Sequence, residues 1–344
     1  MKVMQVMAGA KYGGAEAFFT RLTTALTRAG LDQRVVIRAD ADRARLLREG
    51  GVEPIELPFS GSLDLGTRWG LRRTIKEYGP DIVLSWMNRA TSLTPKGKFV
   101  HVGRLGGYYN LKYYKKCDHL IANTRDIVDY LKGNGWSEEK VHYLPNFVGE
   151  KRAAPLNRRQ FYTPDTAPLV LGLGRLHENK AFDVLLEGIS RVPNVYLWLA
   201  GEGPLRKQLE ARAEQLGIKP RVRFLGWRED TEALFASADI FVCPSRNEPL
   251  GNVVIEAWAQ GVPVIACDAL GPGMLIKQGE NGLLVPVDDG AALGRSIKHL
   301  AENPTLREKL ASAGRAEYEA HYTEAQVVEQ YMAFFQKICA ASPV

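Results

Sequence analysis

Short runs of apolar residues alternate with segments of helical periodicity along the first half of the chain. Seven runs predict strands, at Lys2 to Met7, Gln33 to Arg38, Val52 to Leu57, Asp81 to Trp86, Phe99 to Gly103, His119 to Ala122 and Val141 to Leu144. The segment after the first run carries one helical stripe, at Ala15, Phe18, Phe19, Leu22, Ala25, Leu26 and Ala29. Gly30 is expected to end that helix. Strands that alternate with helices are typical of a parallel sheet, so the pattern predicts the α/β fold class.

The same alternation restarts in the second half. Apolar runs predict strands from Leu169 up to Gly174 and at Tyr196 to Ala200, Arg221 to Leu225, Asp239 to Cys243 and Pro263 to Ala266. A polar stretch without periodicity, Gly149 to Pro168, separates the halves and holds three prolines. Because 344 residues exceed what one core usually supports, we expect two domains. We assign residues 1–150 to the first domain, 151–167 to a linker, 168–320 to the second domain and 321–344 to a terminal helix.

The segment Ser245 to Ala266 reads as a strand end, a polar loop, a helix and a second strand. Asn252 is the expected N-cap of the helix, and Gly261 is the expected residue at its end. Glu248 falls in the loop and Glu256 lies one turn inside the helix, so two carboxylates flank the helix N-terminus. Backbone N–H groups there attract anions, and carboxylates accept from hydroxyls. The segment therefore predicts a site for a ligand with both hydroxyls and phosphate.

Two cations follow the first strand of the second half. The strand ends in Gly174, and Arg175 and Lys180 follow around a short loop before a helix. In parallel sheets, ligands bind beyond the carboxyl ends of the strands. Arginine binds phosphate through a bidentate fork and lysine as a point charge, so the pair indicates a diphosphate site.

The net charge of +6 is concentrated in the first half. Residues 1–150 hold 23 Lys and Arg against 16 Asp and Glu, a net +7, and the remainder is at −1. Two basic clusters stand beside aromatic residues: Arg68, Arg72, Arg73 and Lys76 near Trp69, and Lys112, Lys115 and Lys116 among Tyr108, Tyr109, Tyr113 and Tyr114. A solvated helix face explains either cluster alone. The asymmetry favours an anionic acceptor or an anionic lipid surface.

The four cysteines, Cys117, Cys243, Cys267 and Cys339, lie far apart and form no C-x-x-C pair. We expect free thiols in a reducing compartment and no metal site. No stretch approaches the length of a membrane span. The expected location is the cytoplasm, with peripheral contact at the inner face of the cytoplasmic membrane as a hypothesis drawn from the charge.

The two motifs together carry a family resemblance. Glu248 and Glu256 stand at the two positions of the E-x7-E motif of retaining glycosyltransferases of family 4. The stretch from Gly174 to Ala181 resembles that family's G-R-L-x-x-x-K-G motif, with Ala181 in place of the final Gly. Pro249-Leu250 replaces the common Gly-Phe, while Gly251 keeps the backbone accessible. The resemblance covers the whole chain and is strongest from Leu169 to Val285.

The resemblance implies a GT-B architecture, in which two Rossmann-like domains face each other across a cleft and the terminal helix packs back on the first domain. It implies a nucleoside diphosphate sugar donor of the UDP or GDP type. In the family, the first Glu binds the transferred sugar and the second binds the ribose, which correspond to Glu248 and Glu256. Arg175 and Lys180 correspond to the residues that bind the diphosphate and stabilise the leaving group.

Further donor and acceptor residues follow from the same resemblance. The backbone of the loop and helix start is expected to hold sugar and phosphate, at Leu250, Gly251, Asn252 and Val253. Two turns are expected near the nucleotide, at Gly201 and Gly203 and at Gly226 and Trp227. The glycine-rich loop of the first domain resembles the family's GG-x-E stretch on the acceptor side, at Gly13, Gly14 and Glu16. Either His101 or Arg104 occupies the place of a histidine near the donor sugar, and the sequence does not decide between them.

The sequence therefore predicts a retaining glycosyltransferase that moves a sugar to a cell-envelope glycan or glycolipid of the lipopolysaccharide or capsule type. We expect no cofactor and no divalent metal, because Arg175, Lys180 and the helix N-terminus would already stabilise the leaving diphosphate. A non-catalytic family member that binds the sugar nucleotide, a GT-B epimerase and a phosphorylase are the alternatives. A nicotinamide dehydrogenase is disfavoured because G-x-G-x-x-G is missing.

Overall fold

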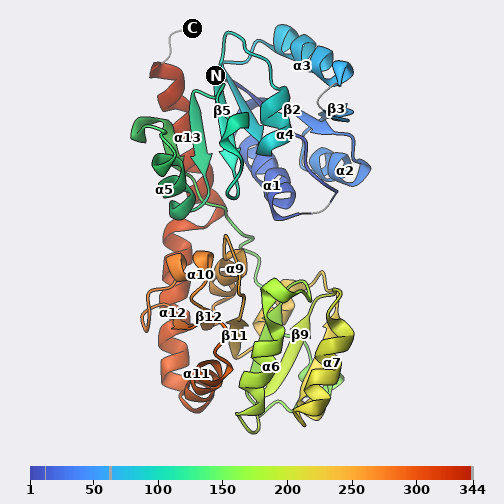
Figure 1. Cartoon of the computed structure of the whole chain (residues 1–344), viewed down its shortest axis with the longest axis vertical. Helices are drawn as coiled ribbons and strands as arrows, with labels where there is room; N and C mark the ends of the chain where they lie inside the picture. Colours follow the sequence, from blue (N-terminus) through green and yellow to red (C-terminus); the bar gives the residue numbers. More distant parts are fainter. Residues whose placement is uncertain (12, 62–63, 342–344) are drawn as a thin grey trace. The chain divides into compact units, whose positions relative to one another are not determined.

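The computed structural model describes residues 1–11, 13–61 and 64–341 of the chain. It divides into two compact units (Figure 1). Unit 1 comprises Met1–Phe147 together with the segment that begins at Glu324, and unit 2 comprises Val148–Thr323. Among the described helices, none is both long enough and apolar enough to cross a bilayer.

Unit 1 is built on a seven-stranded sheet in the order β3-β2-β1-β4-β5-β6-β7, and every neighbouring pair is parallel. The strands are β1 (Lys2–Met7), β2 (Asp32–Arg38), β3 (Pro54–Leu57), β4 (Ile82–Trp86), β5 (Val100–Leu105), β6 (His119–Ala122) and β7 (Val141–Tyr143). Each predicted strand is confirmed, with ends displaced by at most two residues. Consecutive parallel strands need crossover connections, and helices supply most of them.

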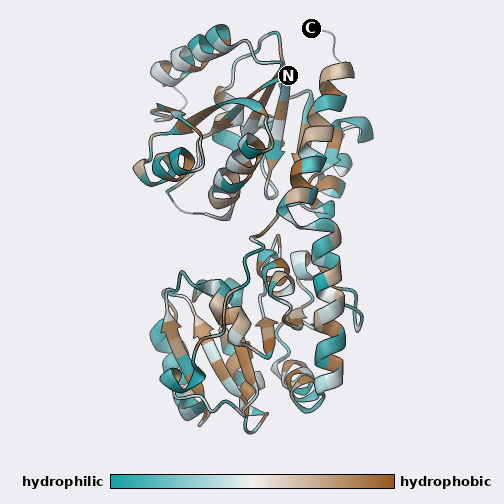
Figure 2. Cartoon of the chain, turned by 180° about the vertical axis from the view of Figure 1, so that it is seen from behind, coloured by the Kyte–Doolittle hydropathy of each residue, from teal (hydrophilic) through white to brown (hydrophobic). Residues whose placement is uncertain are grey.

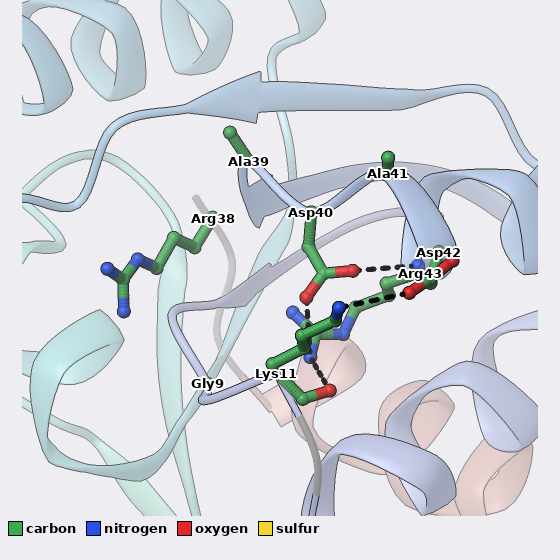
Figure 3. A pocket seen from close by; sticks show the side chains of 8 residues that line it. All are labelled: Gly9, Lys11, Arg38, Ala39, Asp40, Ala41, Asp42 and Arg43. Carbon is green, nitrogen blue, oxygen red and sulfur yellow. Dashed lines mark hydrogen bonds and ion pairs between the residues drawn. The ribbon is translucent and has the colours of Figure 1, made fainter.

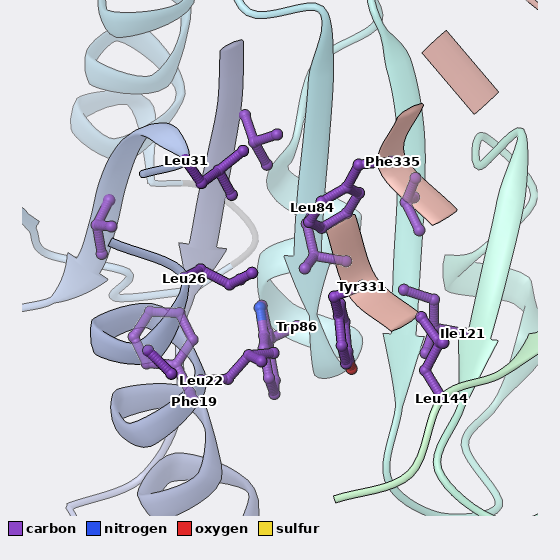
Figure 4. Packing of buried hydrophobic residues seen from close by; sticks show 14 of the residues in the cluster. Phe19, Leu22, Leu26, Leu31, Leu84, Trp86, Ile121, Leu144, Tyr331 and Phe335 are labelled. Carbon is purple, nitrogen blue, oxygen red and sulfur yellow. The ribbon is translucent and has the colours of Figure 1, made fainter. Parts of the chain in front are cut away.

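The helices of unit 1 are α1 (Gly14–Arg28), α2 (Ala41–Glu49), α3 (Leu65–Tyr78), α4 (Met87–Leu93), α5 (Arg125–Gly133) and α13 (Glu324–Ala341). The stripe predicted on α1 is buried at Phe18, Phe19, Leu22 and Leu26. Ala29 is instead exposed, because the helix ends at Arg28 before the stripe reaches it. The terminal helix α13 adds Tyr331 and Phe335 to the same core, beside Trp86 and Leu84 of β4 (Figure 4). The terminal helix is therefore part of unit 1.

Unit 2 has a six-stranded parallel sheet in the order β10-β9-β8-β11-β12-β13. Its strands are β8 (Leu169–Leu173), β9 (Tyr196–Ala200), β10 (Val222–Gly226), β11 (Ile240–Cys243), β12 (Val264–Cys267) and β13 (Leu283–Val285). Its helices are α6 (Phe182–Ser190), α7 (Arg206–Gln215), α8 (Thr231–Ser237), α9 (Asn252–Gln260), α10 (Leu270–Leu275), α11 (Gly290–Glu302) and α12 (Pro304–His321). Its four inner strands, β8, β9, β11 and β12, are apolar (Figure 2) and mostly buried, as expected for a sheet covered on both faces.

The segment assigned to a linker is bound to unit 2 by hydrogen bonds. Arg158 donates to the carbonyl of Ser237 and forms an ion pair with Asp239. Trp198 donates its indole N–H to Thr163 at 2.9 Å. The polar residues of the predicted linker thus form hydrogen bonds and an ion pair with unit 2.

Each sheet reverses its strand order at one place. In unit 1 the order changes between β1 and β4, and in unit 2 it changes between β8 and β11. At such a point the loops that follow the two strands run in opposite directions, which leaves space beyond their carboxyl ends. These two places are where a doubly wound sheet binds ligands, so they define where a functional site is sought.

Candidate functional site

Three neighbouring strands of unit 2 end in glycines at the carboxyl edge of the sheet. Gly174, Gly201 and Gly226 follow or end β8, β9 and β10, and all three have positive φ. Gly174 N–H donates to Ala200, and Gly201 N–H donates to Gly226 at 2.7 Å. A Cβ at Gly201 would lie 1.9 Å from the carbonyl oxygen of Gly174. The backbones therefore approach as closely as glycine allows, and the strand ends form a surface without side chains.

Lys180 lies at the end of a short 3-10 turn, Glu178–Lys180, beside this surface. Its ammonium donates to the Glu248 carboxylate in a short ion pair. Burial alone lowers the pKa of Lys180, but the charge and hydrogen bond of Glu248, with smaller contributions from Cys243 and then Glu256, outweigh it and the pKa lies above its ordinary value. The Lys is therefore charged, and the predicted motif residues Lys180, Glu248 and Glu256 are brought together.

Arg175 directly follows Gly174 and is exposed. No hydrogen bond or ion pair joins its guanidinium to another residue in the described part of the chain. Its five donors are therefore available to a ligand. Trp227, which follows β10, is likewise exposed, at 76%. Gly203 is required by packing, because a Cβ there would lie 2.3 Å from the carbonyl oxygen of Leu176.

Helix α9 begins one residue earlier than predicted. Its N-cap is Gly251, with φ of 68° in the left-handed region, and Asn252 is the first helical residue. The prediction of an Asn252 cap is wrong because Gly251 takes this conformation, which glycine adopts without a steric penalty, and Asn252 is then already helical. No side chain in the described residues caps this end. The first N–H groups of α9, at Asn252 and Val253, directly follow the loop that carries Glu248. Gly261 ends the helix, as predicted.

Arg246 is a site residue that sequence reasoning missed. Its guanidinium donates to Asp183 at 2.6 Å, to Asp288 at 2.6 Å and to the Glu178 carbonyl at 2.9 Å. Its backbone N–H also donates to Asn179. These contacts bind the loop of Glu248 to the turn that ends in Lys180. Nothing in the sequence pairs Arg246 with partners more than forty residues away, so only the fold reveals it.

In unit 1, the glycine-rich loop surrounds a carboxylate instead of presenting open backbone. Glu16 is 6% exposed and accepts from the Ala10 N–H at 2.8 Å. A Cβ at Gly13 would lie 2.2 Å from the Glu16 carboxylate, and one at Gly9 would lie 2.5 Å from it. Gly14, by contrast, has open space around it. Gly9 and Gly13 are therefore glycines because Glu16 folds back against them.

His101 and Arg104 are both buried inside unit 1, at 4% and 1% exposure. His101 contacts Ser85 at 2.9 Å, and burial lowers the pKa of its imidazole to about 4, so it is neutral at pH 7. Arg104 donates to Tyr331 of α13 at 2.8 Å and to Asn146 at 2.6 Å. The family resemblance placed one of these two residues near the donor sugar. In the structure both side chains are buried, because a central strand is covered on both of its faces.

The fold is shared with solved glycosyltransferases. The crystal structure of a glycosyltransferase from Rickettsia africae ESF-5 superposes with a TM-score of 0.89 at 19% identity, and each chain is 99% covered. That of Anabaena Alr3699/HepE in complex with UDP superposes with a TM-score of 0.86 at 22% identity, covering 98% of this chain and all of that one. Two parallel α/β units, each with its own switch point, define a GT-B glycosyltransferase fold.

Sequence comparison gives the family. Residues 12–152 match the model of Glycosyltransferase Family 4, and residues 154–317 match that of Glycosyl transferases group 1. Over 346 residues the chain is 35% identical to the lipopolysaccharide core biosynthesis glycosyltransferase LpsE of Rhizobium meliloti (strain 1021), covering 96% of this chain and 98% of that protein. LpsD of the same strain is 34% identical, with 98% of both covered. The chain belongs to the family 4 glycosyltransferases.

Proposed function

We propose that this glycosyltransferase moves a sugar from a nucleoside diphosphate sugar to a lipopolysaccharide-type envelope glycan, with retention of anomeric configuration and without a divalent metal. The observation that carries the proposal is the convergence of Lys180, Glu248 and Glu256 on the N-terminus of α9, at the switch point of unit 2. The UDP complex of Alr3699/HepE supports a nucleotide donor, and the names of LpsE and LpsD support the acceptor class.

In this proposal the diphosphate lies between Lys180, Arg175 and the first N–H groups of α9. These groups are positive or carry the positive end of a dipole, so they stabilise the charge that develops on the leaving diphosphate. Their charge makes a bound cation unnecessary. Trp227 offers a flat ring for the nucleobase, and Glu256 binds the ribose.

The Lys180–Glu248 ion pair has a consequence for donor binding. A diphosphate that draws Lys180 away from Glu248 leaves this carboxylate, which is 9% exposed, able to accept hydroxyls of the transferred sugar. Cys243 lies nearby, but burial raises the pKa of its thiol, so it stays protonated. With no activated nucleophile among these groups, the acceptor hydroxyl attacks from the side of the departing diphosphate, whose oxygen takes the proton. That path forms the new glycosidic bond with retention.

The test is a donor screen that measures nucleoside diphosphate release with and without lipopolysaccharide core acceptors. We expect release that depends on the acceptor, and a product with the anomeric configuration of the donor by NMR. Inversion would contradict the mechanism. Nucleotide release or donor conversion that is unaffected by every acceptor would contradict transfer.

Arg246→Met is expected to lower turnover about tenfold through Lys180, because one charged hydrogen bond contributes about 1.5 kcal/mol or more. If Arg246 only positions Lys180, Arg246→Met should lower kcat by a larger factor than it changes KM. Adding Arg246→Met to Lys180→Ala should then cause no further loss of turnover. The matched control is Arg191→Met, since Arg191 is a half-exposed unit 2 arginine paired with Glu187. Independent, additive effects of Arg246→Met and Lys180→Ala would contradict the positioning role.

Contact with an anionic membrane is a separate part of the proposal. On α3, Leu65 and Trp69 are 78% and 63% exposed, beside Arg72 and Lys76. The second basic cluster is that of Lys112, Lys115 and Lys116. Its neighbour Tyr114 is buried, so this cluster has fewer exposed aromatic side chains than the sequence suggested. Exposed apolar side chains among basic residues are typical of helices that lie on anionic bilayers.

Replacing both Arg72 and Lys76 by Gln is expected to weaken sedimentation with anionic vesicles on the order of 30-fold, since each basic residue contributes about 1 kcal/mol. Added salt should have the same effect in the wild-type protein. In the control variant, Lys298 and Lys309, two exposed lysines of unit 2, are both replaced by Gln. This variant should bind anionic vesicles as the wild-type protein does. Equal binding to neutral and anionic vesicles would contradict membrane contact and leave the transferase proposal unaffected.

A further inference from the structure

A cavity of about 500 Å³ lies at the switch point of unit 1. Its walls include Ala8 to Ala10 after β1, Arg38 at the end of β2, and Met87 to Arg89 after β4. These segments follow the strands at which the order of the sheet reverses, which is where ligands bind in such sheets. All the residues that line the cavity belong to unit 1.

Two arginines of this cavity are exposed and pair with no carboxylate among the described residues. No ion pair joins Arg38 to any described residue, and the nearest acceptor of Arg89 is the Phe59 carbonyl at 3.4 Å. Glu16, the acidic residue of the wall, already accepts from the Ala10 N–H and is 6% exposed. The accessible charge of the cavity is therefore positive.

The adjoining cavity, about 320 Å³ in volume, shows how this chain treats its other cations. Lys11 pairs with Asp42 at 3.6 Å, and Arg43 pairs with Asp40 at 3.7 Å. In Figure 3 dashed interactions reach both of these cations, and none reaches Arg38, which lies apart from them. Arg38 lines both cavities. Unlike Lys11 and Arg43, it forms no ion pair with a described residue, so its charge is available to a ligand.

The remaining wall suits a saccharide. Tyr109 and Tyr113 supply aromatic surface, and Asn88 supplies an amide whose carbonyl oxygen has no hydrogen-bond partner in the described part of the chain. A buried acceptor without a partner costs free energy until a donor such as a sugar hydroxyl reaches it. Flat apolar surface, hydroxyl partners and two guanidinium forks together match a sugar that bears an oxyanion.

We propose that this cavity binds an acidic sugar of the acceptor, with Arg38 and Arg89 holding its carboxylate or phosphate. The inference rests on the proposed function, because it takes the ligand of unit 1 to be the acceptor. It adds the residues that recognise the acceptor and the group they recognise. Carboxylate and phosphate share the geometry of paired oxygens that a guanidinium binds, so the experiment distinguishes them.

The experiment is calorimetric binding without any donor. The ligand is the core oligosaccharide released from bacterial lipopolysaccharide by mild acid, in four forms: intact, dephosphorylated, carboxyl-reduced, and both. Variants are Arg38→Gln and Arg89→Gln. The control is Arg45→Gln, an exposed arginine of α2 that pairs with Glu49 outside the cavity. Circular dichroism and thermal melting verify that each variant is folded.

We expect Arg38→Gln and Arg89→Gln each to weaken binding of the intact form about tenfold or more, as the loss of a charged hydrogen bond implies, while Arg45→Gln stays within about twofold. Loss of wild-type affinity on dephosphorylation alone identifies phosphate, and loss on carboxyl reduction alone identifies carboxylate. Equal binding of all four forms, no binding of any form, or unchanged affinity in both variants would overturn the proposal.

The two proposals fail in different ways. Normal binding that depends on Arg38 and Arg89, without sugar transfer from any donor, would refute the transferase proposal and retain the anion site. Transfer at wild-type rate in both variants, together with equal binding of neutral and acidic forms, would refute the anion site and retain the transferase.

Discussion

Lys180→Ala is expected to lower turnover on the order of 100-fold or more, because a preorganised charge beside a leaving diphosphate supplies a large share of the barrier reduction. Arg175→Ala should act in the same direction through the second cation. The two differ in their surroundings: Lys180 is partly buried against Glu248, whereas Arg175 is exposed. We therefore expect Lys180→Ala to cost some stability as well, since it leaves the Glu248 carboxylate unpaired.

Steady-state kinetics with a fixed donor and acceptor test this, with unfolding curves measured in parallel to separate the two effects. Lys298→Ala is the control, because it removes an exposed lysine of α11 in the same unit. Wild-type turnover in the folded Lys180→Ala protein would contradict the assignment of Lys180 to the diphosphate.

Arg104→Ala is expected to destabilise unit 1 by about 3 kcal/mol or more, the range of large-to-small replacements in a core. Its guanidinium lies 4.3 Å from the ring centre of Trp86 and 4.8 Å from that of Phe18. It also donates to Tyr331 and Asn146. Removing it leaves a cavity and two buried polar groups without their donor.

Since Tyr331 belongs to α13, the variant should also loosen that helix. Urea unfolding measures the loss, and hydrogen exchange of α13 shows where it occurs. Arg125→Ala is the matched control: Arg125 lies over the Tyr143 ring at 4.9 Å but is exposed, so its loss should cost about 1 kcal/mol at most. A change within about 1 kcal/mol for Arg104→Ala would show that Arg104 does not hold α13 to the sheet.

The strands were predictable because parallel strands buried on both faces read as short continuous apolar runs. The proximity of Lys180 and Glu248 was predictable for a related reason. Each residue follows a strand of the same parallel sheet, and the carboxyl ends of parallel strands lie at one edge of the sheet. By contrast, the N-cap of α9 was not predictable from local preference. Gly251 is the cap, with positive φ, and it packs against Gly271 and Leu275, which lie twenty residues or more further along the chain.

The burial of polar residues in unit 1 could not be predicted from the sequence either. Glu16, His101 and Arg104 looked accessible by analogy with the family, yet all three are buried. A sequence gives the side chain but not its depth, and long-range partners such as Tyr331 are what make a buried arginine tolerable. The cavity of Arg38 and Arg89 was missed for the converse reason, because its wall comes from several separate segments.

We expect the carboxyl edge of unit 2 to bind the diphosphate of the donor. A crystal structure of the chain with a nucleoside diphosphate sugar tests it most directly. Diphosphate oxygens should lie within hydrogen-bond distance of Lys180, Arg175 and the first N–H groups of α9, with Glu256 on the ribose. A nucleotide bound elsewhere, or bound with Lys180 and Glu248 still paired and remote from its phosphates, would contradict it.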